Sequence, residues 1–134
     1  FNAYGMLCIE LFVAKDQHVL VNELAPRPHN SGHYTIEGCV TSQYENHIRA
    51  ILGLPLGSTE LIRPTVMKNI IGNVNKKAEV HGLEEAYKYP EVKIHIYGKE
   101  ECRVGRKMGH ITVTDKTIED ALFKARYAHS KIKF

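Results

Sequence analysis

The sequence predicts an α+β fold built on a largely antiparallel sheet. Apolar runs typical of strands follow one another across short polar turns, as they do in hairpins. Segments with helical spacing and capping residues are mixed among these runs. The chain has 134 residues, of which 43% are hydrophobic, so it can bury a core without disulfide or metal staples. It corresponds to one ordinary domain or to the end of a larger protein.

The first half of the chain predicts a hairpin, a loop and a helix. Residues 6–13 and 18–24 are rich in β-favouring side chains and are separated by a short polar turn. The Pro, Asn, Ser and Gly of residues 25–34 predict a loop. Ser42 and Glu45 then form a capping box, and the apolar residues that follow at helical spacing predict a helix that ends at a glycine.

The second half predicts another group of strands and helices. A turn at residues 54–58 separates the halves, so we expect domains at 1–57 and 58–134. Thr117 and Asp120 form a plausible capping pair for the last helix. The expected elements in order are a strand at 65–71, a short helix at 83–89, a strand at 92–97, a basic turn at 98–107, a strand at 108–114 and a helix at 118–128.

Composition excludes several classes of protein. Lys and Arg total 18 against 15 Asp and Glu, and a net charge of +3 is too small to indicate a nucleic-acid binder. Cys8, Cys39 and Cys102 are far apart and form no Cys-x-x-Cys pair, so neither a zinc ribbon nor a disulfide framework is indicated and a reducing, cytoplasmic compartment is favoured. No apolar run predicts a membrane span or a secretion signal.

Two glutamates of the predicted hairpin face each other. If the loop consists of Asp16 and Gln17, Glu10 lies opposite Glu23 on the neighbouring strand. Side chains alternate between two faces along each strand. The face of the glutamates is then expected to carry Cys8, Phe12, Val19 and Val21, and the other face Ile9, Leu11, Val13, Leu20 and Leu24.

The opposed carboxylates require a neutralising partner. At a separation of ~4 Å and an effective dielectric constant of ~20, their repulsion is on the order of 4 kcal/mol. Oxygen ligands that converge on one point suit Mg²⁺, so Glu10 and Glu23 are a candidate metal site. The alternatives are a different register, since Asp-Gln is a poor two-residue turn, protonation of one glutamate, or an arginine partner.

Two polar segments are candidates for binding anions. The loop after Glu23 contains several hydrogen-bond donors, among them Arg27, His29 and Asn30, and could hold a phosphate beside a metal. Its alternative reading is a polar surface loop. The basic turn carries Lys99, Arg103, Arg106 and Lys107, and is either a second anion site or a solvated turn. A nucleic-acid patch is not favoured there, because few aromatic residues are interleaved.

Three segments carry a family resemblance. Residues 21–37 read VNELAPRPHNSGHYTIE, residues 95–99 read HIYGK and residues 105–110 read GRKMGH. In this order they resemble the 5-(carboxyamino)imidazole ribonucleotide synthase family, the ATP-grasp ligases of purine biosynthesis. The resemblance implies that residues 1–57 belong to the C-terminal lobe of an ATP-grasp domain. Residues 58–134 would then form a small mixed domain that completes the substrate site.

The resemblance also implies a reaction and its participants. Family members use ATP to activate bicarbonate and carboxylate the amine of 5-aminoimidazole ribonucleotide. By resemblance, the metal ligands for Mg²⁺ are Glu10 and Glu23, the ATP-binding residues Asn22 and Glu23, the substrate-binding residues His29, Asn30, Lys99 and Arg106, and the catalytic residues Arg27 and Lys107. Many relatives have Asp-Gly where this chain has Asp16-Gln17, which puts the two-residue turn in doubt.

The chain starts at Phe1 without an initiator Met, and the family's N-terminal half has no counterpart in it. We therefore expect a C-terminal piece that is inactive alone and that belongs to a cytoplasmic enzyme, typically a homodimer. Two other readings stay open. One is another ATP-grasp ribonucleotide ligase, such as the formate-using glycinamide ribonucleotide transformylase. The other is a non-catalytic domain that binds nucleotides or RNA.

Overall fold

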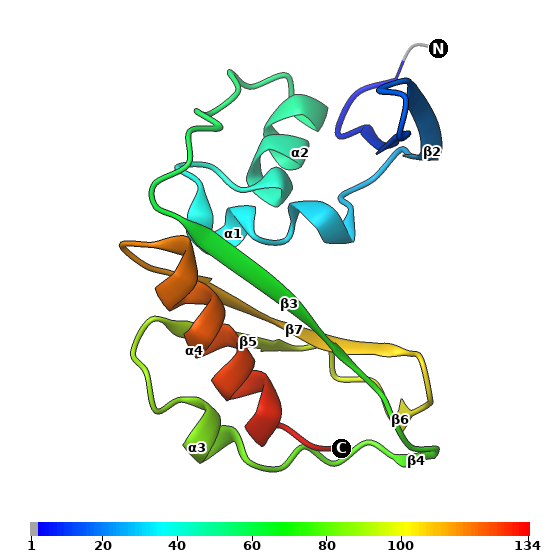
Figure 1. Ribbon diagram of the computed structural model, residues 1–134. Helices are drawn as coiled ribbons and strands as arrows, with labels where there is room; N and C mark the ends of the chain where they lie inside the picture. Colours follow the sequence, from blue (N-terminus) through cyan, green and yellow to red (C-terminus); the bar gives the residue numbers. More distant parts are fainter. Residues whose placement is uncertain (1–2) are drawn as a thin grey trace. The chain divides into compact units, whose positions relative to one another are not determined.

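The computed structural model describes residues 3–134, which form two compact units (Figure 1). The first unit extends to Ile62 and the second spans Arg63–Phe134. The division lies beyond the turn at which we expected the boundary, because residues after this turn pair with the first unit. Cys39 forms a β-bridge with Leu61, and the amide of Ile62 donates to the carbonyl of Gly38 at 2.7 Å.

The first unit contains an antiparallel hairpin followed by short helices. Strands β1 (Cys8–Val13) and β2 (Val19–Ala25) form the hairpin. The segment expected as loop contains the 3₁₀ turn η1 (Asn30–Gly32), and the short helix α1 (Thr35–Gly38) directly follows it. Helix α2 (Gln43–Ile51) begins after Ser42, which caps it as predicted by accepting from the amide of Glu45 at 3.1 Å. The Glu45 carboxylate accepts from Arg49.

The hairpin has a three-residue loop, so the expected two-residue turn is wrong. The amide of Ala14 donates to the carbonyl of His18 at 2.8 Å, which leaves residues 15–17 as the loop. Gln17 adopts a positive φ of 68°, the conformation that this kind of loop requires at its last position. A bulge at Asn22 then shifts the register by one residue, so Glu10 still pairs with Glu23.

The bulge changes which residues share a face. Leu11 pairs with Val21 and Val13 pairs with Val19, so both valines lie on the face opposite the glutamates and not beside them. Leu20 pairs with Phe12 and joins the face of the glutamates. The bulge restores the predicted pairing only from Glu23 to the end of β2. Residues between the loop and the bulge are paired one position away from the prediction, so their predicted faces are wrong.

The second unit is a three-stranded antiparallel sheet covered by a helix, as Figure 1 shows. The strand order is β3-β7-β5, so the last strand in sequence lies between the two earlier ones. The elements are β3 (Thr65–Ile71), β4 (Lys76–Lys77), α3 (Leu83–Ala86), β5 (Val92–Ile96), β6 (Glu101–Cys102), β7 (Lys107–Thr114) and α4 (Ile118–Lys131). The sequence predicts the main strands and both helices, and it misses the small β4–β6 pair.

Small side chains allow α4 to pack closely on the sheet. Ala121, Ala125 and Ala128 recur at helical spacing and are fully buried in the core of the second unit. They share this core with Ile111 and Val113 of the central strand β7. Thr117 caps the helix by accepting from the amide of Asp120 at 3.1 Å, as the sequence predicts. No helix among residues 3–134 has the length and apolar character needed to cross a membrane.

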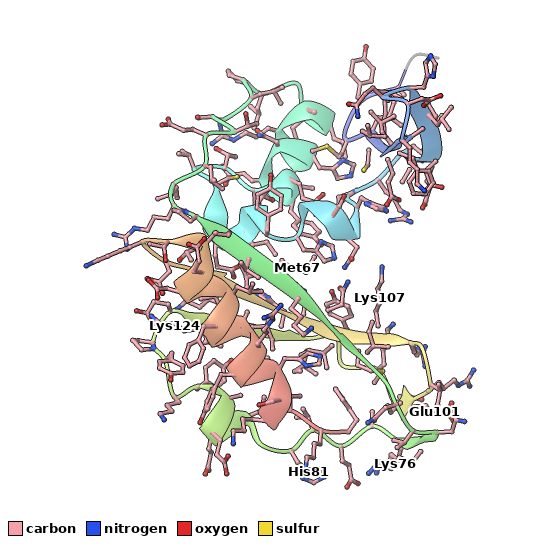
Figure 2. The ribbon with its side chains drawn as sticks, viewed as in Figure 1. Met67, Lys76, His81, Glu101, Lys107 and Lys124 are labelled. Atoms are coloured by element: carbon pink, nitrogen blue, oxygen red, sulfur yellow. The ribbon has the colours of Figure 1, made fainter. Side chains whose placement is uncertain are left out.

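An ion-pair cluster joins α4 to the sheet. The ammonium of Lys124 lies 2.9 Å from Glu91 Oε1 and 2.7 Å from Asp115 Oδ2 (Lys124 is labelled in Figure 2). Hydrogen bonds from Lys124 lower the pKa of both carboxyls from their ordinary values of 4.5 and 3.8. The hydrogen bonds that Lys124 donates to Asp115 and, second, to Glu91 raise the pKa of Lys124 above its ordinary value of 10.5. All three shifts favour the charged forms of these side chains in the folded protein.

Lys124→Met should therefore lower thermal stability most at neutral pH. The lowered carboxyl pKa values stabilise the folded state above the ordinary carboxyl range, and this stabilisation is lost as pH falls through the lowered values. The Tm difference from wild type should shrink in acid, and a Tm series against pH measures it. Lys131→Met, which removes the more exposed pair with Glu85, is the control and should depend less on pH. A Tm difference for Lys124→Met that is the same at every pH would contradict this assignment.

Candidate functional site

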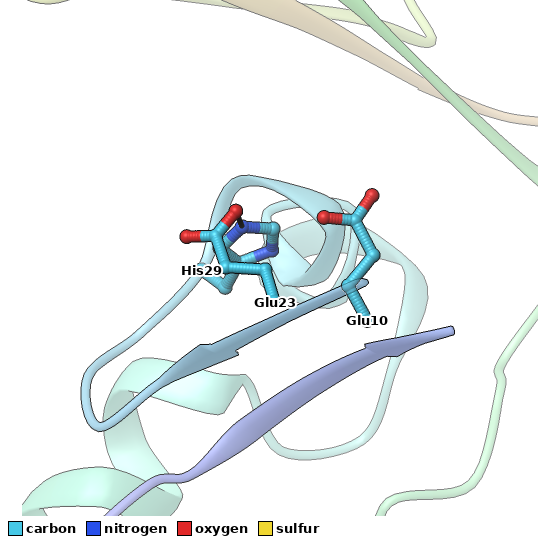
Figure 3. A group of neighbouring side chains, drawn as sticks. All are labelled: Glu10, Glu23 and His29. Carbon is cyan, nitrogen blue, oxygen red and sulfur yellow. Dashed lines mark ion pairs between the residues drawn. The ribbon is translucent and has the colours of Figure 1, made fainter. Parts of the chain in front are cut away.

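Glu10 and Glu23 stand side by side on the hairpin with His29 next to them. Figure 3 shows both carboxylates rising from neighbouring strands on the same side, with the His29 ring beside Glu23. One ligand atom from each of the three residues lies within 4.8 Å of the others. The ion pair that the structure shows for Glu23 is with His29, at 4.0 Å between Oε2 and Nε2. Glu10 and Glu23 are cross-strand partners, which excludes the alternative that a different register separates them.

The ring of His29 is held in one orientation by Ser31. Its Nδ1 accepts from the amide of Ser31 at 3.3 Å and lies 2.8 Å from the Ser31 hydroxyl. A backbone amide always donates, so Nδ1 carries a lone pair and the proton of the neutral ring sits on Nε2. The nitrogen that faces Glu23 is therefore a hydrogen-bond donor. His29 suits an anion or a carboxylate better than it suits a metal ion.

The two carboxylates fit a magnesium site. Mg²⁺ prefers oxygen ligands, keeps several waters and is commonly bound through one or two carboxylates together with phosphate oxygens. Glu10 and Glu23 provide such a pair, and the side chain of Glu23 is 49% exposed, so a hydrated ion or a phosphate can reach it. Mg²⁺ also supplies the positive charge that opposed carboxylates need.

The structure also places the other residues predicted for this site. Asn22 is the bulge residue directly before Glu23. Arg27 is exposed, and its guanidinium donates to the carbonyl of Pro28 at 3.1 Å, so it lies along its own loop. Asn30 begins the 3₁₀ turn that follows His29. Of the site residues predicted in the first unit, the structure brings Glu10, Glu23 and His29 into one cluster.

Gln43 is a residue of this site that sequence reasoning missed. Its side chain is buried at the start of α2 and forms hydrogen bonds to both backbone groups of His29. Its fourteen-residue separation from His29 follows no motif spacing, so the only signal for it is a polar residue directly after Ser42.

The basic turn of the second unit is ordered. Strand β6 within it pairs with β4, and Lys76 and Glu101 lie together at this end of the unit in Figure 2. Lys99 and Arg106 line one hollow of about 400 Å³. Lys99 Nζ donates to the carbonyl of Lys107 at 2.6 Å, and Arg106 donates to the carbonyl of Glu101 at 3.1 Å. Arg103, Glu100 and Glu101 also line the hollow, and Arg103 pairs with Glu101 at 2.6 Å. Lys99 and Arg106 add two further cations, which can take an anion such as a phosphate.

Lys107 occupies a different position. It is exposed at the start of β7, where the register with β3 shifts, and its side chain projects away from the sheet in Figure 2. It does not contribute to the lining of the hollow formed by Lys99 and Arg106. Its carbonyl nevertheless fixes the Lys99 ammonium, so the two lysines are structurally linked.

Comparisons with known proteins match both units. Residues 1–44 match the family described as the ATP-grasp domain, and residues 65–124 match the phosphoribosylaminoimidazole carboxylase C-terminal domain. The N5-carboxyaminoimidazole ribonucleotide synthase of Bacillus subtilis is 54% identical over 111 residues. That alignment covers 83% of this chain and 28% of the relative.

Solved structures that resemble this chain belong to enzymes of the same name. The N5-carboxyaminoimidazole ribonucleotide synthetase of Thermotoga maritima has a TM-score of 0.87 and 55% identity, covering 97% of this chain and 37% of its own. The synthase of Aspergillus clavatus, solved with ADP and 5-aminoimidazole ribonucleotide, has a TM-score of 0.82 and 40% identity, covering 97% of this chain and 35% of its own. The chain therefore spans between 28% and 37% of the length of these relatives.

Proposed function

Because the chain belongs to the N5-carboxyaminoimidazole ribonucleotide synthase family, we propose that it works as part of a longer ATP-grasp ligase, called the full-length ligase below. This enzyme carboxylates 5-aminoimidazole ribonucleotide with bicarbonate and converts ATP to ADP and phosphate, as a step of purine biosynthesis. The observation that carries the proposal is the cluster of Glu10, Glu23 and His29 on a hairpin that matches the ATP-grasp family.

In this proposal the hairpin binds the metal–nucleotide complex. Glu10 and Glu23 hold Mg²⁺, and Asn22 contributes beside Glu23 to the binding of ATP. When bound, Mg²⁺ neutralises phosphate charge during transfer of the γ-phosphoryl group. Glu23 is half-exposed and neither glutamate is among the buried core residues, so Mg²⁺ can bind without rearrangement of the core.

The loop and the basic turn serve the substrates. Transfer of the γ-phosphoryl group to bicarbonate gives carboxyphosphate and ADP. The substrate amine then attacks the carboxyl carbon, phosphate leaves and the amine gives up a proton. Arg27 stabilises the transferring phosphoryl charge, His29 and Asn30 bind substrate oxygens, Lys99 and Arg106 bind the ribonucleotide phosphate, and Lys107 acts on the bicarbonate-derived carboxylate.

The compartment and assembly of the full-length ligase are part of the proposal. Cys8, Cys39 and Cys102 are free thiols, as suits a reducing cytoplasm. We also expect a homodimer, which sedimentation analysis of the full-length ligase would measure.

Substrate-dependent turnover tests the proposal. The full-length ligase should hydrolyse ATP only when bicarbonate and 5-aminoimidazole ribonucleotide are both present, and ¹³C from labelled bicarbonate should appear on the amine. ADP release that instead depends on formate and glycinamide ribonucleotide would identify the sister ligase. RNA binding with a steep salt dependence and no Mg²⁺ requirement would favour a non-catalytic domain.

A further inference from the structure

We propose that Gln43 is a positioning residue that fixes His29 so that its Nε2 proton faces Glu23. The role of His29 in this inference rests on the proposed function, whereas its orientation is visible in the structure itself. The hydrogen bonds from Gln43 to the proposed site go to the backbone of His29, so it acts through that residue.

The contacts between the two residues are reciprocal. The amide of His29 donates to Gln43 Oε1 at 3.0 Å, and Gln43 Nε2 donates to the carbonyl of His29 at 2.8 Å. The side-chain amide thus pairs with both backbone groups of one loop residue, as a neighbouring strand does. Gln43 is only 8% exposed, so these bonds are protected from water and losing one leaves a buried polar group unpaired.

Neighbouring residues fix Gln43 in turn. Its own amide donates to the Thr35 hydroxyl at 2.9 Å, and its Nε2 also donates to His33 Nδ1 at 2.9 Å. Gly32 packs against the same side chain, since a Cβ at this position would meet Gln43 Oε1 at 2.5 Å. The amide side chain therefore has one orientation, with oxygen toward the His29 amide and nitrogen toward its carbonyl.

The position of the His29 ring depends on this backbone clamp. Ser31 sets the rotation of the ring through Nδ1, but Ser31 lies on the same short 3₁₀ turn and moves with it. Gln43 connects this turn to the regular helix α2 and so fixes it relative to the first unit. Loss of the clamp should let His29 and Ser31 move together away from Glu23.

Asn46 provides a matched control on the same helix. It is 7% exposed and forms the same reciprocal pair with a different loop residue. Its Oδ1 accepts from the amide of Gly57 at 2.8 Å, and its Nδ2 donates to the carbonyl of Gly57 at 3.2 Å. Gly57 is not one of the proposed site residues, so a change at Asn46 should cost stability through the same chemistry without moving His29.

Gln43→Glu and Asn46→Asp in the full-length ligase separate positioning from stability. Each replaces the amide nitrogen that donates to a carbonyl with an oxygen that repels it. In Gln43→Glu, kcat should fall about 10²-fold because a small misplacement of a catalytic-site group has effects of this size, while the KM for ATP stays near the wild-type value. Asn46→Asp, corrected for the folded fraction, should keep the wild-type kcat. Gln43→Met, which introduces no charge, replaces Gln43→Glu if that variant does not fold.

A second measurement does not depend on activity. In protein labelled with ¹⁵N-histidine, the ring signals of His29 in Asn46→Asp should match those of the wild type. In Gln43→Glu they should shift and broaden, because the ring moves away from Glu23 while Ser31 still sets its tautomer. Equal kcat values for the two variants, or His29 ring signals that Gln43→Glu leaves unchanged, would overturn the inference. If the wild type lacks the proposed turnover, the proposed function fails, and the His29 ring signals alone decide the role of Gln43.

Discussion

Replacing Glu23 by glutamine in the full-length ligase should abolish ATP turnover while leaving the fold intact. The substitution removes one of the two charges that hold Mg²⁺ and leaves Glu10 as a single carboxylate ligand. The loss of kcat should be on the order of 10³-fold, the upper end of what one electrostatic group contributes at an active site. The side chain of Glu23 is 49% exposed and is not part of the hydrophobic core, so little packing is lost.

The same substitution should not lower the thermal stability of the protein without ligands. Removing one of two opposed carboxylates relieves repulsion, so the Tm in the absence of Mg²⁺ should stay constant or rise. The increase in Tm on adding Mg²⁺ and ADP should disappear, because that increase reports binding to the folded state. Glu45→Gln is the matched control, since Glu45 pairs with Arg49 on the exposed side of α2. Near-normal turnover by the Glu23 variant would remove the metal assignment.

The hairpin shows how far the sequence predicts the site. The strands and the opposed glutamates follow from alternation and a short turn, but the loop length does not. Asp16-Gln17 lacks the glycine that favours a two-residue turn, and Gln17 adopts the left-handed conformation of a longer loop. The extra loop residue is offset by the bulge at Asn22. The glutamate pair was therefore predicted correctly, whereas the faces of Val19 and Val21 were not.

Contacts between distant residues account for what the sequence could not predict. The N-caps Ser42 and Thr117 are local signals, so the sequence predicts the starts of both helices. The pairing of Gln43 with His29 depends on how the loop folds back onto α2, and no periodicity encodes it. The basic turn was likewise expected as one segment, but its pairing with β4 places Lys99 and Arg106 in one hollow and leaves Lys107 out of it.

Lys107→Ala in the full-length ligase should impair carboxylation far more than nucleotide binding. The variant keeps the backbone carbonyl that accepts from Lys99 Nζ at 2.6 Å, so Lys99 and the adjacent hollow should stay in place. What is removed is one exposed ammonium, which in our proposal stabilises the carboxylate derived from bicarbonate. Carboxylated product should fall about 10²-fold, the effect expected for one charge-stabilising group.

The decisive measurement is the ratio of ADP to carboxylated product. If Lys107 acts after phosphoryl transfer, its loss should leave the KM for ATP unchanged. The ADP formed per carboxylated ribonucleotide should rise, because more carboxyphosphate is hydrolysed before the amine attacks it. Lys76→Ala is the matched control, because Lys76 is an exposed lysine of the same unit in strand β4. It should keep the wild-type ratio. A parallel loss of ATP affinity in Lys107→Ala would place the ammonium with the nucleotide instead of the carboxylate.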